Sequence, residues 1–209
     1  MIFKRKRMFL IVSLILVSVL VVACGSSDNN TPPASSDGAT NGSTEVVGLT
    51  EAFVEGPTIL TSVGQSADVE MIKALMDNAG ISYTMDKLVK ADGLGDAKTL
   101  ILAVGGSSKG LGAAGIDADD ELSRTTDLID AAKENGVNII AMHIGGENRR
   151  GELSDKFIRP SLENADYIIA VEEGNNDGLF TDIASKNSIP MDLVASISEA
   201  IEPLKNAYK

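Results

Sequence analysis

The sequence contains one cysteine, one histidine and no tryptophan in 209 residues. A single cysteine excludes an internal disulfide, and one histidine with one cysteine excludes the clusters of these residues that bind zinc or copper. Aromatic residues make up only 4% of the chain, which leaves little material for binding sugars or single-stranded nucleic acids by ring stacking. Basic residues are also scarce, at 18 against 30 acidic ones, and they form no basic patch. We therefore expect no nucleic-acid partner.

The first 23 residues have the pattern of a secretory signal. Residues 4–7 are all basic, whereas residues 8–23 carry no charge and are rich in Leu, Val and Ile. This uncharged run is shorter than the roughly 20 apolar residues that a membrane-spanning helix needs. It ends in Val21-Val22-Ala23-Cys24-Gly25. The string resembles the lipobox of bacterial lipoproteins.

The resemblance implies cleavage before Cys24, a diacylglycerol on its sulfur, and attachment to a membrane on the side that faces away from the cytoplasm. Two acyl chains are enough for stable anchoring. Removal of residues 1–23 leaves 14 basic and 30 acidic side chains, a net charge of −16, so the rest of the chain should stay off an anionic bilayer. An uncleaved anchor helix and an incidental buried cysteine are the alternatives.

The next segment, residues 24–56, is dominated by Ser, Thr, Asn, Gly and Asp. Such a composition buries too little apolar surface to offset the entropy cost of ordering, so we predict a disordered tether that carries the lipidated cysteine at its start. An extra strand over residues 45–50 is the alternative. The globular domain is predicted to span residues 57–209, a length that suits one domain.

From residue 57 onward, short apolar runs rich in β-branched residues alternate with helical periodicity, which is typical of βαβ units around a parallel sheet. Strands are predicted at residues 58–63, 81–85, 99–104, 137–144 and 167–171. Helices are predicted at residues 67–79, 119–135, 154–164 and 179–185, with Pro160 interrupting the third. A last helix opens with a capping box at residues 196–199, and Pro203 should bend or end it.

These elements predict an α/β fold in three layers, α/β/α, around a single open, mostly parallel five-stranded sheet. The simplest strand order is the flavodoxin-like 2-1-3-4-5. The pattern resembles uncharacterised exported flavodoxin-like domains of bacterial lipoproteins, a resemblance that implies no particular activity. The domain is too short for the two-lobed clamp of ordinary solute-binding lipoproteins.

Ligands of open α/β sheets bind beyond the carboxyl ends of the strands, where the strand order reverses. For the predicted order this place lies between the loops at residues 64–68 and 105–115. Both loops are rich in glycine and hydroxyl groups, which suit a carboxylate or phosphate. The predicted ligand-binding residues there are Gln65, Ser66, Ser107, Ser108 and Lys109. Ordinary tight turns, with Ser66 capping a helix, are the alternative.

The loop that follows the fourth predicted strand adds His143, Arg149 and Arg150 to the predicted site. Two adjacent guanidinium groups could fork onto a carboxylate or phosphate. The alternative is salt bridging within the loop, to Glu147, Glu152 or Asp155. His143 lies at the end of a strand, where it could act as a donor or base, and a buried histidine with satisfied hydrogen bonds is the alternative.

Familiar ligand-binding patterns are matched only in part. Residues 110–115 spell G-x-G-x-x-G, but we predict no helix inside this loop, and it does not follow the first strand. Residues 106–110 spell G-x-S-x-G, but a nucleophile elbow turns directly from a strand into a helix. The P-loop pattern is absent. Residues 172–178 gather carboxylates and amides without the spacing of an EF-hand, so we predict no metal there, with Ca²⁺ as the alternative.

Together these features predict a membrane-anchored extracytoplasmic lipoprotein whose domain binds a small anionic ligand or a partner protein and needs no cofactor. One alternative is an extracytoplasmic hydrolase or transferase that uses His143 with a loop serine. Another is a structural component of an envelope complex. The lack of a second histidine, a catalytic cysteine or a dense carboxylate pair favours binding over catalysis, and fold alone does not decide.

Overall fold

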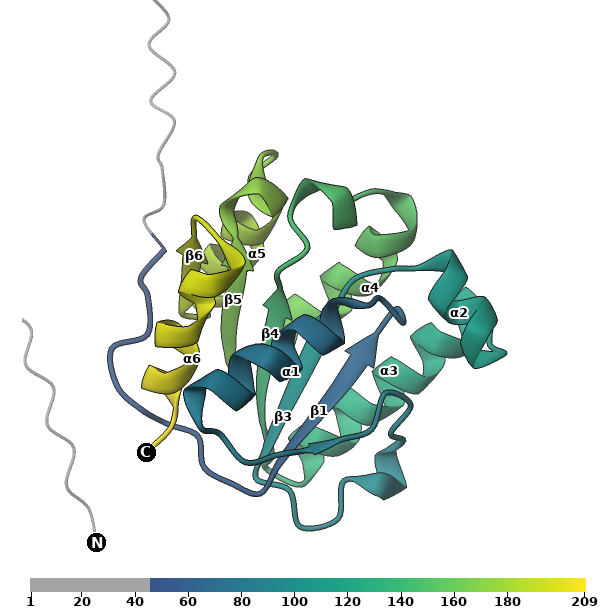
Figure 1. The fold of residues 1–209 in the computed structure, drawn as a ribbon, viewed down its shortest axis with the longest axis horizontal. Coiled ribbons are helices and arrows are strands. Elements are labelled where there is room, and N and C mark those ends of the chain that lie inside the picture. Colours follow the sequence, from purple (N-terminus) through teal and green to yellow (C-terminus); the bar gives the residue numbers. More distant parts are fainter. Residues whose placement is uncertain (1–45) are drawn as a thin grey trace, which may run out of the picture. The chain divides into compact units, whose positions relative to one another are not determined.

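The computed structural model describes residues 46–209, so Cys24 and the predicted signal lie outside the described residues. Six parallel strands form one sheet in the order β2-β1-β3-β4-β5-β6 (Figure 1). Their bounds are β1 Thr58–Val63, β2 Thr84–Met85, β3 Thr99–Val104, β4 Asn138–His143, β5 Tyr167–Val171 and β6 Met191–Val194. The α/β class and the flavodoxin-like order are confirmed, and β6 is an edge strand that the sequence analysis did not predict.

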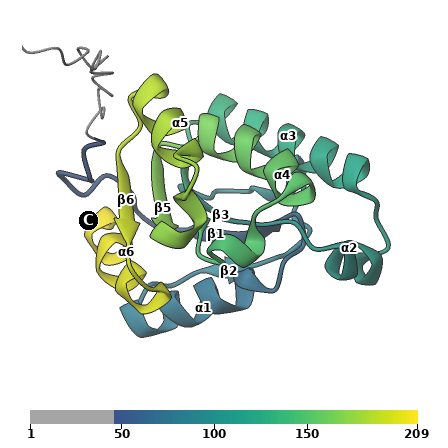
Figure 2. The same ribbon diagram turned by 90° about the horizontal axis from the view of Figure 1, so that it is seen from above.

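Helices cover both faces of the sheet, as Figure 2 shows. One face carries α1 (Asp68–Ala79) and α6 (Ile201–Ala207), and the other carries α3 (Ala118–Glu134), α4 (Glu152–Glu163) and α5 (Leu179–Asn187). A short helix, α2 (Ser108–Ala114), follows β3. Four 3₁₀ turns complete the elements: η1 Ala91–Gly93, η2 Glu147–Arg149, η3 Glu172–Asn175 and η4 Ile197–Ala200. Within residues 46–209, no helix has both the length and the apolar character needed to span a membrane.

The central strand β3 shows why this sequence forms a sheet with two covered faces. All six of its residues are buried, and its side chains alternate between the two cores. Leu100 and Leu102 pack under α3 and α4, whereas Ile101 and Ala103 pack under α1 and α6. A strand that is buried on both sides needs a continuous apolar run rather than an alternating one, and the run at residues 99–104 meets this requirement.

Residues 46–55 pack along the edge of β6. The N–H of Met191 donates to the carbonyl of Val47, and the N–H of Leu49 donates to the Asp192 carboxylate. Val54 is fully buried and forms a parallel bridge with Tyr208 at the end of α6. The packed part of the chain therefore begins before the predicted boundary at residue 57. Residues 46–50 form no strand, so they protect the sheet edge without extending it.

The two predictions about proline were wrong. α4 is continuous over residues 152–163 with Pro160 inside it, so Pro160 does not interrupt the helix. Pro203 lies in the first turn of α6, where its missing N–H is not needed by the helix, so it neither bends nor ends α6. The Ser196 hydroxyl bonds to the Glu199 carboxylate and does not cap a helix N–H.

The prediction that no helix opens inside residues 105–115 was also wrong. Ser107 caps α2 by accepting a hydrogen bond from the N–H of Gly110, and Gly115 ends the helix in the left-handed conformation. α2 lies so close to the loop after β1 that a Cβ on Gly110 would be 1.8 Å from the carbonyl oxygen of Gln65. Gly110 is therefore required for this contact.

We expect Gly110→Ala to destabilise the domain by about 1–3 kcal/mol, because the added methyl group has no space. Gly112→Ala in the same helix is the matched control, since nothing lies within 4 Å of its Cβ position. It should stabilise the domain by about 0.5–1 kcal/mol through better helix propensity. Urea unfolding of both variants measures the difference, and equal effects would contradict the close packing of α2.

Candidate functional site

The loops after β1 and β3, where the crevice was predicted, pair directly with each other through a bridge between Gln65 and Gly106, and a buried ion pair lies beside the first of them. Glu121 in α3 is fully buried, and its carboxylate accepts hydrogen bonds from the Arg124 guanidinium at 2.8 Å, the Gly64 N–H at 2.9 Å and the Gln65 amide at 3.0 Å. Arg124 also donates to the carbonyls of Ser62 and Val89. These contacts join β1, α3 and the loop before η1.

The five ligand-binding residues predicted in these two loops do not form a common site. Three of them make hydrogen bonds within the protein, and the other two are exposed on α2. The Gln65 amide donates to Glu121 and to the carbonyl of Lys87, which uses both of its N–H groups. The buried Ser66 hydroxyl accepts from the N–H of Asp68, and Ser107 caps α2. Ser108 and Lys109 are exposed on the first turn of α2.

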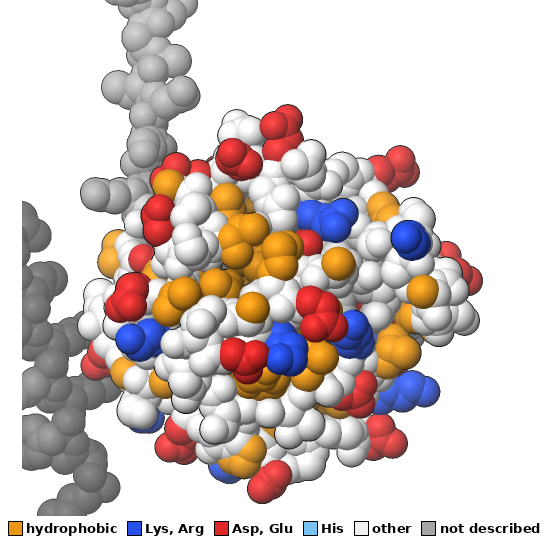
Figure 3. All heavy atoms as spheres, in the orientation of Figure 1, with side chains coloured by type: hydrophobic (Ala, Val, Ile, Leu, Met, Phe, Trp, Pro, Cys, Tyr) orange, Lys and Arg blue, Asp and Glu red, His pale blue; other side chains and the backbone are white. Residues whose placement is uncertain are grey.

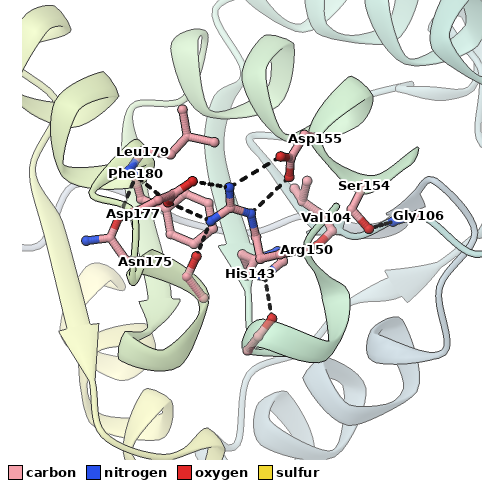
Figure 4. A network of polar contacts seen from close by, with 12 residues as sticks. Val104, Gly106, His143, Arg150, Ser154, Asp155, Asn175, Asp177, Leu179 and Phe180 are labelled. Atoms are coloured by element: carbon pink, nitrogen blue, oxygen red, sulfur yellow. Dashed lines mark hydrogen bonds and ion pairs between the residues drawn. The ribbon is translucent and has the colours of Figure 1, made fainter. Parts of the chain in front are cut away.

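Arg150 is held entirely by the protein (Figure 4). Its guanidinium donates to Asp155, Asp177 and the carbonyl of Gly174, and these contacts use all five of its N–H groups. It also lies over the ring of Phe180, 5.0 Å from the ring centre. The Arg150 hydrogen bond lowers the pKa of Asp177 to about 2. The structure thus shows the alternative for Arg150, a salt bridge to Asp155, and does not support a fork onto a ligand.

His143 is fully buried at the end of β4. Its Nδ1 lies 3.0 Å from the carbonyl of Val104 and its Nε2 lies 3.3 Å from the carbonyl of Gly146, while its ring packs edge-on against Phe180. Burial lowers the pKa of this imidazole, although both carbonyls favour its protonated form. Because both ring nitrogens face backbone carbonyls and not a serine hydroxyl, the geometry does not support a hydrolase that uses His143 as its base.

Arg149 differs from Arg150 because only one of its N–H groups is bonded within residues 46–209. Its Nε donates to Asp68 Oδ1 at 3.1 Å, and its side chain is 34% exposed. Asp68 is the first residue of α1 and is buried. The sequence analysis missed Asp68, because an acidic residue in the first turn of a helix is already explained by the helix dipole.

A groove of about 750 Å³ lies at the carboxyl ends of β4, β5 and β6, between α1 on one side and η4 and α6 on the other. Figure 3 shows hydrophobic side chains gathered above α1 and beside α6. The larger apolar residues of its walls are Met71, Leu75, Ile144, Val171, Ile197 and Ile201. Its polar side chains are Asn78, Asn148, Glu173, Ser196 and Ser198. Glu173 is the one charged residue among those that line it.

The sequence contained a partial signal for this groove. Met71, Leu75 and Asn78 follow helical spacing on α1, and Gly145-Gly146 directly follow the fourth predicted strand. The opposite wall depends on η4, which follows the unpredicted strand β6. A second hollow, of about 720 Å³, lies between η1 and α3. Its buried charged group, Arg124, is already bonded to Glu121, so we take the groove beside α1 as the candidate site.

We expect His143 to make the stability of the domain depend on pH. Its folded pKa is lower than its unfolded value of about 6.5, so between the two values the unfolded chain binds the proton and the folded domain does not. Its stabilising contribution is therefore complete above about pH 6.5 and is lost as the pH falls, at up to about 1.4 kcal/mol per pH unit.

His143→Gln should lack this slope, and urea unfolding between about pH 7.5 and 5 measures it for both proteins. The Asp177 carboxyl does not interfere, since its pKa of about 2 lies outside this window. Parallel stability curves for the two proteins would show that the buried imidazole does not titrate differently on unfolding.

Comparison with known proteins identifies a family but no activity. No curated protein matches the sequence. Among solved structures, the psychrotrophic esterase EstA from a Pseudoalteromonas species has a TM-score of 0.29 at 13% identity, covering 66% of this chain and 78% of that one. TesA has a TM-score of 0.28 at 10% identity, covering 64% and 76%. Scores of this size carry no argument about function. Over residues 55–208, the chain belongs to the family described as a domain of unknown function (DUF6305).

Proposed function

We propose that this protein is a membrane-anchored lipoprotein whose α/β domain is a binding module outside the cytoplasm, with the groove beside α1 as its ligand site. The anchor is supported by the basic residues 4–7, the uncharged run to residue 23 and the lipobox-like string that ends at Cys24-Gly25. The binding role is supported by the groove, whose volume of about 750 Å³ falls within the range of small-molecule sites.

The composition of the groove changes the expected ligand. Its walls are mainly apolar, and its charged lining residue, Glu173, is negative. The cations of the predicted site do not line it: Arg150 is saturated by the protein, Arg149 is bonded to Asp68, and Lys109 lies on α2. A small anion is therefore not favoured. The geometry supports a molecule with an apolar body and a few hydrogen-bonding groups, and the apolar walls are the observation that carries this conclusion.

The volume of the groove also favours a small molecule over the partner-protein and envelope-complex alternatives. A stable protein interface buries about 800 Å² on each partner. In the described part of the chain, the large exposed hydrophobic residues are Val47, Leu88 and Leu193, which lie on different elements. Single exposed residues of this kind need no partner.

Binding in the groove is testable with Nile red, an uncharged dye whose fluorescence rises in apolar surroundings. The protein is the chain from residue 25 onward, which contains the whole sheet and both cores. Ala74 is exposed on α1 and lines the groove, so Ala74→Trp should fill it and weaken dye binding by about tenfold or more. Ala113→Trp, at an exposed position of α2, should leave binding unchanged. Absence of dye binding, or an equal effect of both variants, would count against the groove.

Lipidation is testable on the full chain expressed in a bacterial host. We expect mass spectrometry to find a mature N-terminus at Cys24 that carries diacylglycerol, and the protein to sediment with membranes. Cys24→Ser should abolish the modification, because no other cysteine is present. Ser26→Ala, two residues further on, should be processed normally. An unmodified sulfur in the mature protein would contradict the proposed anchor.

A further inference from the structure

Asp68 has an unsatisfied carboxylate oxygen in the interior of the domain. The residue is 1% exposed, and its Oδ1 accepts a hydrogen bond from Arg149 Nε at 3.1 Å. Its Oδ2 is buried and has no hydrogen-bond partner within residues 46–209. An ionised carboxylate accepts several hydrogen bonds, and an unsatisfied buried acceptor is costly, so this atom requires an explanation.

The unsatisfied oxygen is buried next to Gly145, a glycine that lines the groove, although Asp68 itself does not line it. Asp68, Met71 and Leu75 are spaced by three and four residues, which places them on one face of α1, and Met71 and Leu75 line the groove. Gly145 lines the groove as well, and a Cβ on this glycine would lie only 2.6 Å from Asp68 Oδ2. Because Gly145 has no side chain, the carboxylate and the groove are separated by little more than the backbone of one residue.

Arg149 is the side chain that covers the Asp68 carboxylate. A Cβ built on Gly145 would lie 2.0 Å from Arg149 Cγ. The Arg149 side chain therefore packs directly against this glycine, and its Nε reaches Asp68. The side chain is 34% exposed, and one hydrogen bond to Asp68 is its polar contact within the described residues. The buried Asp68 carboxylate needs a cation, and Arg149 supplies one N–H to it from a partly exposed side chain, so a cation that donates more hydrogen bonds could take its place.

The charged side chain that lines the groove is also negative. Glu173 lines the groove and forms no hydrogen bond or ion pair with the rest of residues 46–209. It lies close to Gly146, whose Cβ would be 3.1 Å from Glu173 Oε2. An ammonium group is a compact cation with three donors, so it suits a site with an unsatisfied carboxylate oxygen and a second free carboxylate.

We infer that the ligand of the groove is a small molecule with a protonated amine at the end of an apolar chain. The chain lies against the apolar walls, and the ammonium group replaces Arg149 at Asp68 and also faces Glu173. In the protein without ligand, the Arg149 guanidinium occupies the position at Asp68 that the ammonium group of the ligand would take. This inference rests on the proposed function, since it assigns the chemistry of the same groove.

The test is displacement of Nile red at neutral pH by three molecules with the same alkyl chain: n-octylammonium, 1-octanol and octanoate. We expect n-octylammonium to displace the dye at an about tenfold lower concentration than 1-octanol, and octanoate to be the weakest, because a charge-assisted hydrogen bond is gained only by the amine. Asp68→Asn should reduce the preference for the amine to about twofold or less. Arg149→Met should strengthen n-octylammonium binding severalfold relative to 1-octanol.

Asp130→Asn is the matched control, because it removes the same charge from an exposed position of α3. It should keep the preference for the amine, and an equal loss in Asp130→Asn and Asp68→Asn would overturn the inference in favour of general attraction to an acidic protein. Should Asp68→Asn fail to fold, Glu173→Gln tests the same point at an exposed residue and should reduce the preference by about threefold or more.

The two proposals fail in different ways. If 1-octanol displaces the dye but n-octylammonium shows no preference over it, the amine inference is wrong and the groove remains a binding site. If Nile red binding is not weakened by Ala74→Trp, the groove itself is not the site, and the proposed function is wrong whatever the amine does.

Discussion

The buried ion pair between Glu121 and Arg124 holds together β1, α3 and the loop before η1. It lies beside the loop after β1, one of the two loops at which the strand order reverses, which in open α/β sheets is the usual ligand crevice. Removal of one partner from a buried pair costs about 3–5 kcal/mol, because the remaining charge is left without compensation. Glu121 also bonds to the Gly64 N–H and the Gln65 amide, so the pair fixes the turn after β1.

The groove lies at the carboxyl ends of the strands towards the β6 side of the sheet. β6 adds one more strand beyond β5, and the chain then turns back through η4 into α6, which packs next to α1. Ala195 to Ile201 thereby form a wall that faces Met71 and Leu75 across the groove. A sheet of only five strands would have no such wall. The edge strand and the groove are therefore two results of one addition to the fold.

The parts of the structure that could be predicted from the sequence are those set by local pattern. Residues 100–104 are apolar throughout, a pattern that predicts a strand buried on both faces. β6 was not predicted because it is short and lacks a continuous apolar run. It has four residues, of which Asp192 is polar and Leu193 is 36% exposed. α2 was not predicted because two of its seven residues are glycines, which have a low helix propensity. Its cap and its close contact with Gln65 offset that weakness, and neither is visible in the sequence.

The candidate site could be predicted only in part, because partners far apart in the sequence decide what a charged side chain does. Arg149 and Arg150 are neighbours, yet Arg150 is bonded at all five N–H groups to residues up to 27 positions away, and Arg149 at one. Arg150 ties the end of η2 to α4 and η3, and this holds the loop after β4 against two neighbouring elements. If the proposed amine replaces Arg149 at Asp68, a loop held in this way would lose little ordering entropy on binding.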